Sequence, residues 1–169
     1  MAKSSTDVKS DRRRRRGGDD QVAQLKGRRF GRVLTKLGKI TRDQVHEALR
    51  VQRARRDKGE RDLLGQILVE LGLVDDFDVL EALAGQAGMR FLRFEPDDLD
   101  SSLVEKLPAE SANTYQIVPL EYNESTKVLT VAMKSPENFR AVDDLRLLMG
   151  FNVEAVVAPE SDIDAALTS

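Results

Sequence analysis

The chain has 169 residues, of which 33% are charged; it contains no cysteine and a single histidine, His46. These counts exclude a disulfide framework, a thiol nucleophile, a zinc–thiolate site and a metal site made of several histidines. No uncharged apolar run approaches the length of a membrane span, and the first ten residues are too polar for a secretory leader. We therefore expect a cytoplasmic protein.

The small net charge of −2 hides two oppositely charged halves. Residues 1–61 hold 20 basic and 8 acidic residues, whereas residues 62–169 hold 7 basic and 21 acidic ones. Such asymmetry predicts that the first half meets phosphate, nucleic acid, an anionic membrane or an acidic protein surface, including the second half of the chain itself.

Residues 1–26 are poor in large apolar side chains and centre on five consecutive arginines, Arg12, Arg13, Arg14, Arg15 and Arg16. This composition predicts a disordered basic tail. Such a tail could bind nucleic acid or an anionic membrane electrostatically, and this is the alternative function that we consider. Specific nucleic-acid recognition is disfavoured because no aromatic residue interleaves the arginines to stack on bases.

Two copies of one helical pattern follow, 34 residues apart. Phe30, Val33, Leu34 and Leu37 have helical spacing before Gly38, and Thr41 and Gln44 have the spacing of a capping box that opens a second helix. Leu64 to Gly72 and Asp75 to Gly88 repeat this order. Nine of the 22 aligned positions are identical: Gly31/65, Leu34/68, Leu37/71, Gly38/72, Val45/79, Glu47/81, Ala48/82, Leu49/83 and Gln52/86.

A 34-residue helical period also suggests tetratricopeptide repeats, but two copies without tryptophan do not fit that architecture. We expect the leucines of each copy to lie in the core and Gly38 and Gly72 to end helices. Gly31 and Gly65 fall inside helices, where glycine costs about 1 kcal/mol relative to alanine, which suggests close approach of a backbone or a ligand.

The pattern changes after Gly88. An extended segment at 89–94 precedes two short helices at 101–107 and 108–115, two strands at 117–120 and 128–133, a helix at 137–149, a strand at 153–157 and a last helix after Pro159. The predicted fold class is α+β: two helix-turn-helix repeats over residues 27–94, then a small unit of β-hairpin, helix, strand and helix over 95–169.

The sequence has little sign of catalysis. Neither G-x-x-x-x-G-K-[ST] nor G-x-G-x-x-G is present, so no nucleotide-binding fold is indicated. His46 has no serine or cysteine signature beside it, and we interpret it as a surface histidine. Asp143, Asp144, Asp162 and Asp164 are interpreted as solvated charges rather than as metal ligands. We predict no enzyme, no metal and no cofactor.

The repeated motif can be written G-x-x-L-x-x-x-G-x-[IV]-x-x-x-x-V-x-x-A-L-x-x-Q, preceded by Arg29 in the first copy and by Leu63 in the second. With the stretches 116–120, 129–133 and 143–146, it resembles the N-terminal domain of the type II secretion and type IV pilus assembly ATPases, the GspE/PilB type that includes the MshE N-terminal cyclic di-GMP-binding domain. The likeness covers residues 28–168.

This resemblance implies a regulatory and docking module that normally precedes a hexameric ATPase core. Because the sequence stops at Ser169, before any such core, the resemblance implies that the chain is a freestanding copy or a piece of a longer protein. The implied partners are the ATPase core or inner-membrane assembly-platform proteins, which would place the chain peripherally at the inner membrane. Cyclic di-GMP is the implied ligand, and the matching positions are Arg29, Gly31, Leu34, Gly38, Leu49 and Gln52 in the first copy and Gly65, Leu68, Gly72, Leu83 and Gln86 in the second.

Overall fold

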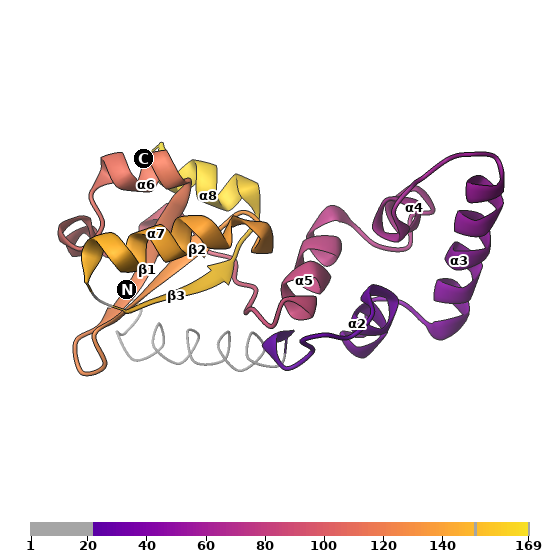
Figure 1. Cartoon of the computed structure of the whole chain (residues 1–169), viewed down its shortest axis with the longest axis horizontal. Helices are drawn as coiled ribbons and strands as arrows, with labels where there is room; N and C mark the ends of the chain where they lie inside the picture. The colour runs from indigo at the N-terminus through magenta and orange to yellow at the C-terminus, as the bar shows by residue number, and fades with distance from the viewer. Residues whose placement is uncertain (1–21, 151, 169) are drawn as a thin grey trace, which may run out of the picture.

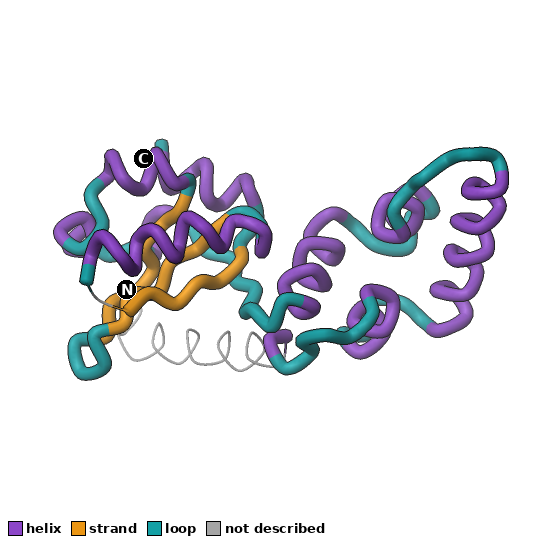
Figure 2. Tube along the Cα trace, viewed as in Figure 1, coloured by secondary structure: helices purple, strands orange, loops and turns teal. Residues whose placement is uncertain are grey.

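The computed structural model describes residues 22–150 and 152–168, which form a helical unit joined to an α+β unit (Figures 1 and 2). The arginine run 12–16 and most of the expected tail lie outside the described residues. Within the described part, the α+β fold class and the order of elements predicted from the sequence are confirmed.

The helical unit consists of α2 (Phe30–Lys36), α3 (Arg42–Asp57), α4 (Leu64–Glu70) and α5 (Asp76–Gln86). The predicted capping box is present, since Thr41 Oγ1 accepts from the backbone N–H of Gln44 and Gln44 Oε1 accepts from that of Thr41. Asp75 and Asp78 form the same arrangement at the start of α5. The apolar faces of the helices meet in one core, whose most buried members are Val33, Leu34, Ala48, Ile67, Leu68 and Ala82.

The α+β unit contains three strands, β1 (Ile117–Asn123), β2 (Val128–Met133) and β3 (Asn152–Val157). β2 lies in the middle, antiparallel to β1 and parallel to β3. Its helices are α6 (Ala109–Tyr115), α7 (Phe139–Met149) and α8 (Glu160–Leu167), with short 3₁₀ turns η1 (Pro96–Asp98), η2 (Ser101–Glu105) and η3 (Pro136–Asn138).

Alternate residues of the strands enter two separate cores because successive side chains of a strand point to opposite faces. Leu129, Val131 and Met133 pack with Val142 and Leu145 of α7. On the other face, Val118, Ala132 and Val156 pack with Ile163 of α8 and Phe94. The sheet is therefore covered by helices on both faces, as Figure 1 shows.

The two units meet around a small apolar cluster, and this cluster corrects both predicted domain boundaries. Val22, which we expected in the disordered tail, is 3% exposed and packs with Ala84, Phe91 and Val157. Phe91, expected in the helical subdomain, forms a parallel bridge with Val157, the last residue of β3. Sequence periodicity failed here because a single buried valine and a one-residue bridge leave no repeating pattern.

Candidate functional site

The two copies of the motif pack by exchanging their halves. α2 packs against α5 and α3 against α4, so the first helix of each copy contacts the second helix of the other. Gln52 Nε2 donates to the carbonyl oxygen of Asp62 at 3.2 Å, just before α4. Gln86 Nε2 donates to the carbonyl oxygen of Arg28, also at 3.2 Å, just before α2. Asp62 and Arg28 are themselves 34 residues apart, so the two bonds are equivalent and relate the copies by a two-fold-like symmetry.

Gly31 and Gly65 let the first helix of each copy approach the second helix of the same copy closely, with a residue of the other copy beside them. A Cβ atom at Gly31 would lie 2.8 Å from Cγ1 of Val45, with Leu64 as the next neighbouring residue. A Cβ atom at Gly65 would lie 3.2 Å from Cγ1 of Val79 and 3.3 Å from Cζ of Phe30. Phe30 and Leu64 occupy matching positions of the two copies, so the glycines obey the same symmetry. Their role is helix packing, which is the close backbone approach that the sequence indicated.

Gly38 and Gly72 end α2 and α4 in the same way. Both have positive φ, at 73° and 72°. Beyond each glycine, the next backbone N–H reaches back to the helix: Lys39 N to the carbonyl oxygen of Leu34 at 3.0 Å, and Leu73 N to that of Leu68 at 3.1 Å. This is the Schellman motif, in which glycine avoids the penalty of the left-handed conformation. Both positions are therefore explained by folding alone.

The leucines of the motif divide into core and surface positions. Leu34 and Leu68 are fully buried and Leu49 is half-buried. Leu83 is 40% exposed, so the expectation that it lies in the core is wrong. It lies one turn before Gln86 on α5, and its exposure distinguishes it from the symmetric position Leu49.

The remaining motif position is the one where the copies differ. Arg29 immediately precedes α2 and is exposed, and Leu63 immediately precedes α4 and is 69% exposed. Because the halves are exchanged, Arg29 belongs with Leu83 and Gln86 on α5, whereas Leu63 belongs with Leu49 and Gln52 on α3. We call these the arginine half-site and the leucine half-site. Each is assembled from both copies, which sequence spacing alone could not show.

Ion pairs further distinguish the two helix pairs. Lys39 Nζ lies 3.3 Å from Asp78 and 3.4 Å from Glu81 of α5. Burial alone lowers the pKa of Lys39, but the carboxylates of Glu81 and Asp78 outweigh it, so the pKa is raised above its ordinary 10.5. On the other side, Arg55 contacts Asp62 at 2.9 Å and Glu70 at 2.7 Å.

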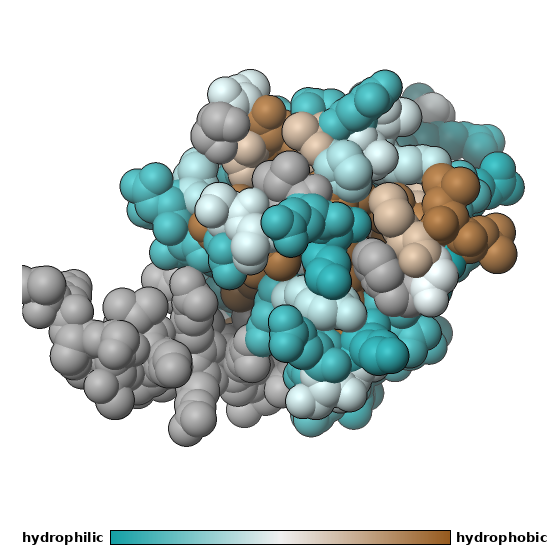
Figure 3. Space-filling model, turned by 90° about the vertical axis from the view of Figure 1, so that its left-hand side faces the viewer, coloured by the Kyte–Doolittle hydropathy of each residue, from teal (hydrophilic) through white to brown (hydrophobic). Residues whose placement is uncertain are grey.

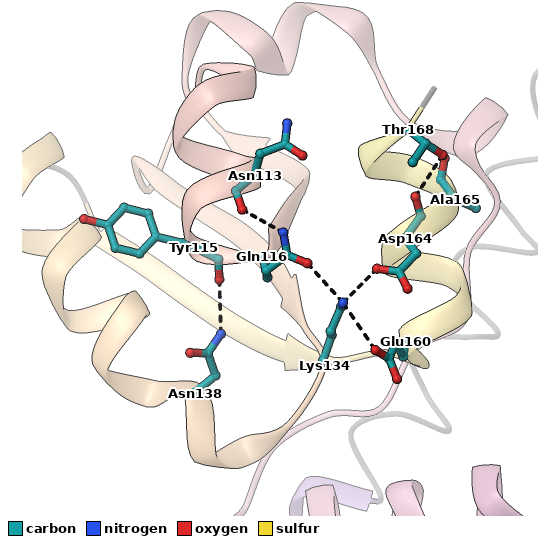
Figure 4. Close-up of polar contacts among 9 residues, drawn as sticks. All are labelled: Asn113, Tyr115, Gln116, Lys134, Asn138, Glu160, Asp164, Ala165 and Thr168. Atoms are coloured by element: carbon teal, nitrogen blue, oxygen red, sulfur yellow. Dashed lines mark hydrogen bonds and ion pairs between the residues drawn. The ribbon is translucent and has the colours of Figure 1, made fainter.

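The α+β unit contains a polar cluster at the end of β2 that links three elements (Figure 4). Lys134 Nζ lies 2.7 Å from Asp164 Oδ1 and 3.0 Å from Gln116 Oε1. Gln116, which follows α6 with φ of 55°, donates through Nε2 to the carbonyl oxygen of Asn113. The hydrogen bond to Asp164 is the main reason that the pKa of Lys134 is raised. The geometry is that of a structural tie between α6, β2 and α8.

The side chain of Asp162 also has a structural role that we did not expect. It is 12% exposed, accepts from the backbone N–H of Phe94 at 3.2 Å and pairs with Arg93 at 3.4 Å. Arg93 in turn lies over the ring of Phe77 on α5, 4.5 Å from its centroid. The interpretation of Asp162 as a solvated charge is therefore wrong, because a long-range contact of this kind leaves no local sequence signal.

Hydrophobic side chains are exposed at one end of α7. Leu147 is 85% exposed and Leu148 lies beside it, close to the end of the helix. This end of the α+β unit faces the viewer in Figure 3, where a strongly hydrophobic group of side chains protrudes among hydrophilic neighbours. Exposed apolar groups of this kind are typical of interaction surfaces.

In residues 22–150 and 152–168, the acidic side chains and the single histidine form no metal-binding cluster. His46 lies exposed on α3, as the sequence suggested. Within the described ranges there is no group of three or more histidine, aspartate or glutamate side chains able to hold a metal ion. No helix in that part of the chain is both long enough and apolar enough to cross a bilayer.

Comparison with known proteins gives consistent matches. Residues 87–169 match the family model described as the MshEN domain. Over 139 residues, 82% of the chain, the sequence is 32% identical to the type IV pilus assembly ATPase PilB of Myxococcus xanthus. The PilB of Thermus thermophilus is 34% identical over an alignment that covers 83% of the chain. The chain spans only 23% and 19% of the length of these two relatives.

Two solved structures resemble the chain to different degrees. A structure of MshE with cdg, cyclic di-GMP, superposes with a TM-score of 0.55 at 24% identity, covering 83% of this chain and 97% of that one. The N-terminal domain of XpsE is more distant, with a TM-score of 0.46 at 20% identity, covering 76% of this chain and 96% of that one. The likeness to MshE shows a shared fold.

Proposed function

Because residues 87–169 belong to the MshEN domain family and the chain is homologous to the N-terminal region of PilB, we propose that it is a non-catalytic regulatory and docking module of a type IV pilus or type II secretion ATPase system. The observation that carries this proposal is the extent of the PilB alignment. An alignment over 139 of 169 residues must include at least residues 31–139, and so most of both repeats. It occupies less than a quarter of the relative.

Docking is the function to test first, with the ATPase core of the same system as the partner. We expect the 169-residue chain and a purified ATPase core to form a complex in sedimentation velocity. We expect this complex to hydrolyse ATP at a rate different from that of the core alone. Leu147→Asp with Leu148→Asp should weaken the complex if the exposed end of α7 contributes. Failure of the unaltered chain to bind the core would reject docking on this partner.

A second function, binding of cyclic di-GMP, is supported by the arginine half-site. Arg29 is exposed and directly follows Arg28, whose carbonyl oxygen accepts from Gln86, and Leu83 is exposed one turn before Gln86, so a guanidinium and an apolar side chain are both available to a ligand. A guanidinium pairs well with phosphate or with a guanine edge. The leucine half-site lacks the arginine, which predicts weaker or one-sided binding. Among the relatives above, MshE is the one described with this nucleotide, and it shares the fold.

Calorimetry with cyclic di-GMP at two salt concentrations, with GTP as competitor, tests this second function. We expect saturable binding that Arg29→Ala abolishes and that Arg42→Ala, a matched exposed arginine at the start of α3, leaves intact. Leu63→Arg gives the second copy the arginine that the first copy has and should tighten binding roughly ten- to hundredfold, since a hydrogen bond to a charged group contributes about 1.5–3 kcal/mol. Equal binding by the Arg29→Ala and unaltered chains would remove the half-site from consideration.

A further inference from the structure

A groove of about 800 Å³ runs between α7 and β3. Its apolar lining includes Val128, Met133, Val142 and Ala155, and Phe139, which is 57% exposed, lines it as well. Four charged side chains line it as well: Arg90, Asp143, Arg146 and Glu154. Ala23, which directly follows the buried Val22, also lines the groove.

One side of the groove is the open edge of the sheet. Val157 at the end of β3 pairs with the segment 90–92 through two backbone hydrogen bonds, but residues 152–155 have no neighbouring strand on that side among the described residues. Arg146 covers part of the edge by donating twice to the carbonyl oxygen of Val153, at 3.0 and 2.7 Å. Open strand edges and apolar linings favour the binding of an additional segment.

The charged lining retains unused hydrogen-bonding capacity. Glu154 pairs through Oε1 with Arg90 at 3.2 Å, and Asp143 pairs through Oδ1 with Arg146 at 3.1 Å. Both acids are more than half exposed, and their second oxygens have no partner in the part of the chain that the structure describes. Arg90 Nε is buried in this region, again without an acceptor from residues 22–150 or 152–168. An occupant with cationic side chains and a backbone carbonyl group would satisfy these atoms.

The chain itself has such a segment within reach. Val22 is fixed against Val157, and Arg16 precedes it by six residues, which span at most about 20 Å. Arg12 lies ten residues before Val22, within about 35 Å. Glu154 is three residues from Val157, about 10 Å along the strand. Every part of the groove therefore lies within the reach of the arginine run.

We propose that the arginine run Arg12–Arg16 docks intramolecularly in the groove between α7 and β3. The guanidinium groups pair with the free oxygens of Asp143 and Glu154, and one stacks on the exposed ring of Phe139. The aliphatic parts of the arginine side chains cover the apolar lining. Residues 89–169 hold 7 basic and 15 acidic residues, a net charge of −8, whereas residues 27–88 carry a net charge of +2, and this difference favours the α+β unit as the site for the arginine run.

Docking of the run would withhold its five arginines from other anions. Because the segment is tethered, individually weak pairs suffice, since a short flexible linker gives an effective concentration in the millimolar range. An anionic partner would then have to displace Asp143 and Glu154 to reach the arginines. This inference concerns the tail and the groove, and it stands or falls independently of the proposed docking and nucleotide binding.

The absence of cysteine makes a direct test simple. Ser10→Cys introduces a unique attachment point for a nitroxide next to the arginine run, and paramagnetic broadening of backbone amides then reports where the run lies. We expect broadening of amides in 142–146 and 152–155 at about 0.1 M salt. It should be largely lost at about 1 M salt, where the Debye length falls from about 10 Å to about 3 Å.

Two variants test the charge pairs, and a third controls for net charge. Replacing Arg12–Arg16 by glutamine leaves the described residues unaltered and should abolish the salt-sensitive broadening. Asp143→Lys with Glu154→Lys should do the same. The matched pair Asp97→Lys with Glu110→Lys changes the net charge equally on η1 and α6, outside the groove lining, and should preserve the broadening.

Three results would overturn the proposal. Broadening that is unchanged in the glutamine variant would reflect tethering alone. Broadening centred on the helical unit would place the run elsewhere. Broadening of an isotope-labelled chain by a separate spin-labelled chain in a mixed sample would show that the occupant comes from a second copy.

Discussion

The substitution Gly31→Ala tests whether the repeated glycines serve packing. Its new Cβ would lie 2.8 Å from Cγ1 of Val45, whereas carbon atoms in good contact are about 3.5–4.0 Å apart. Overpacking of this kind costs about 1–3 kcal/mol, and the better helix propensity of alanine returns up to about 1 kcal/mol. We expect the free energy of unfolding to fall by about 1–2 kcal/mol.

A double-mutant cycle with Val45→Ala isolates the cause. Val45→Ala alone removes two methyl groups from a half-buried side chain and should cost about 1–1.5 kcal/mol. In the double variant the alanine at position 31 occupies the vacated space, so the loss should not exceed that of Val45→Ala alone. The expected coupling energy is therefore about 1–2 kcal/mol in favour of the double variant.

Urea unfolding of the whole chain, followed by far-UV circular dichroism, measures all four corners of the cycle. Gly65→Ala is the internal comparison, because its Cβ would meet Val79 at 3.2 Å and a small displacement suffices. We expect a change within about 0.5 kcal/mol for that variant, since modest crowding and improved helix propensity oppose each other. If the losses of Gly31→Ala and Val45→Ala add to within about 0.3–0.5 kcal/mol, the packing explanation is refuted.

Three further predictions rest on separate contacts. Gln52→Ala and Gln86→Ala should each lower the free energy of unfolding by a similar amount, about 0.5–1.5 kcal/mol, because each removes one hydrogen bond to a carbonyl group. Urea unfolding of both variants measures the two losses, and clearly unequal losses would contradict the symmetry. Lys127 has φ of 56° in the turn after β1, a left-handed conformation that costs a non-glycine residue about 1 kcal/mol. Lys127→Gly relieves this strain and should raise the thermal midpoint of unfolding, whereas Lys127→Ala keeps the strain and should not raise it. The raised pKa of Lys134 means that its ion pairs stabilise the fold below pH 10.5 and are lost as pH rises through the higher folded-state pKa. Lys134→Met should therefore be less stable at neutral pH but lose less stability between about pH 9 and 12 in melting experiments, and parallel pH curves for the two proteins would contradict this.

The sequence predicted most of the local structure because the signals there are local. The capping box at Thr41, the terminal glycines Gly38 and Gly72, and the helical spacing of buried residues each operate within a few positions of the chain. The duplication was visible for the same reason, as was the order of strands and helices after Gly88. These features depend on backbone conformation and on the period of apolar side chains.

The exchange of halves could not be predicted from the same signals. Each copy contains a glycine, leucines and a glutamine, and nothing in its spacing says that Gln52 bonds to the segment before α4 while Gln86 bonds to the segment before α2. The glutamines therefore looked free to bind a ligand. The exposure of Leu83 was missed as well, because helical spacing places it on the apolar face and only tertiary packing leaves it uncovered.

The reciprocal glutamine bonds have a consequence for the origin of the helical unit. A solitary 34-residue copy would leave its glutamine without an acceptor, and each of its two helices would lose the helix of the other copy on which it packs, so it could not complete its own core. Two identical solitary copies could complete each other through an isologous homodimer, in which each glutamine bonds to the opposite subunit. The present arrangement is the one expected when such a dimer is fused into one polypeptide. Only after that fusion can the two copies diverge from each other, as they do where the first has Arg29 and the second has Leu63.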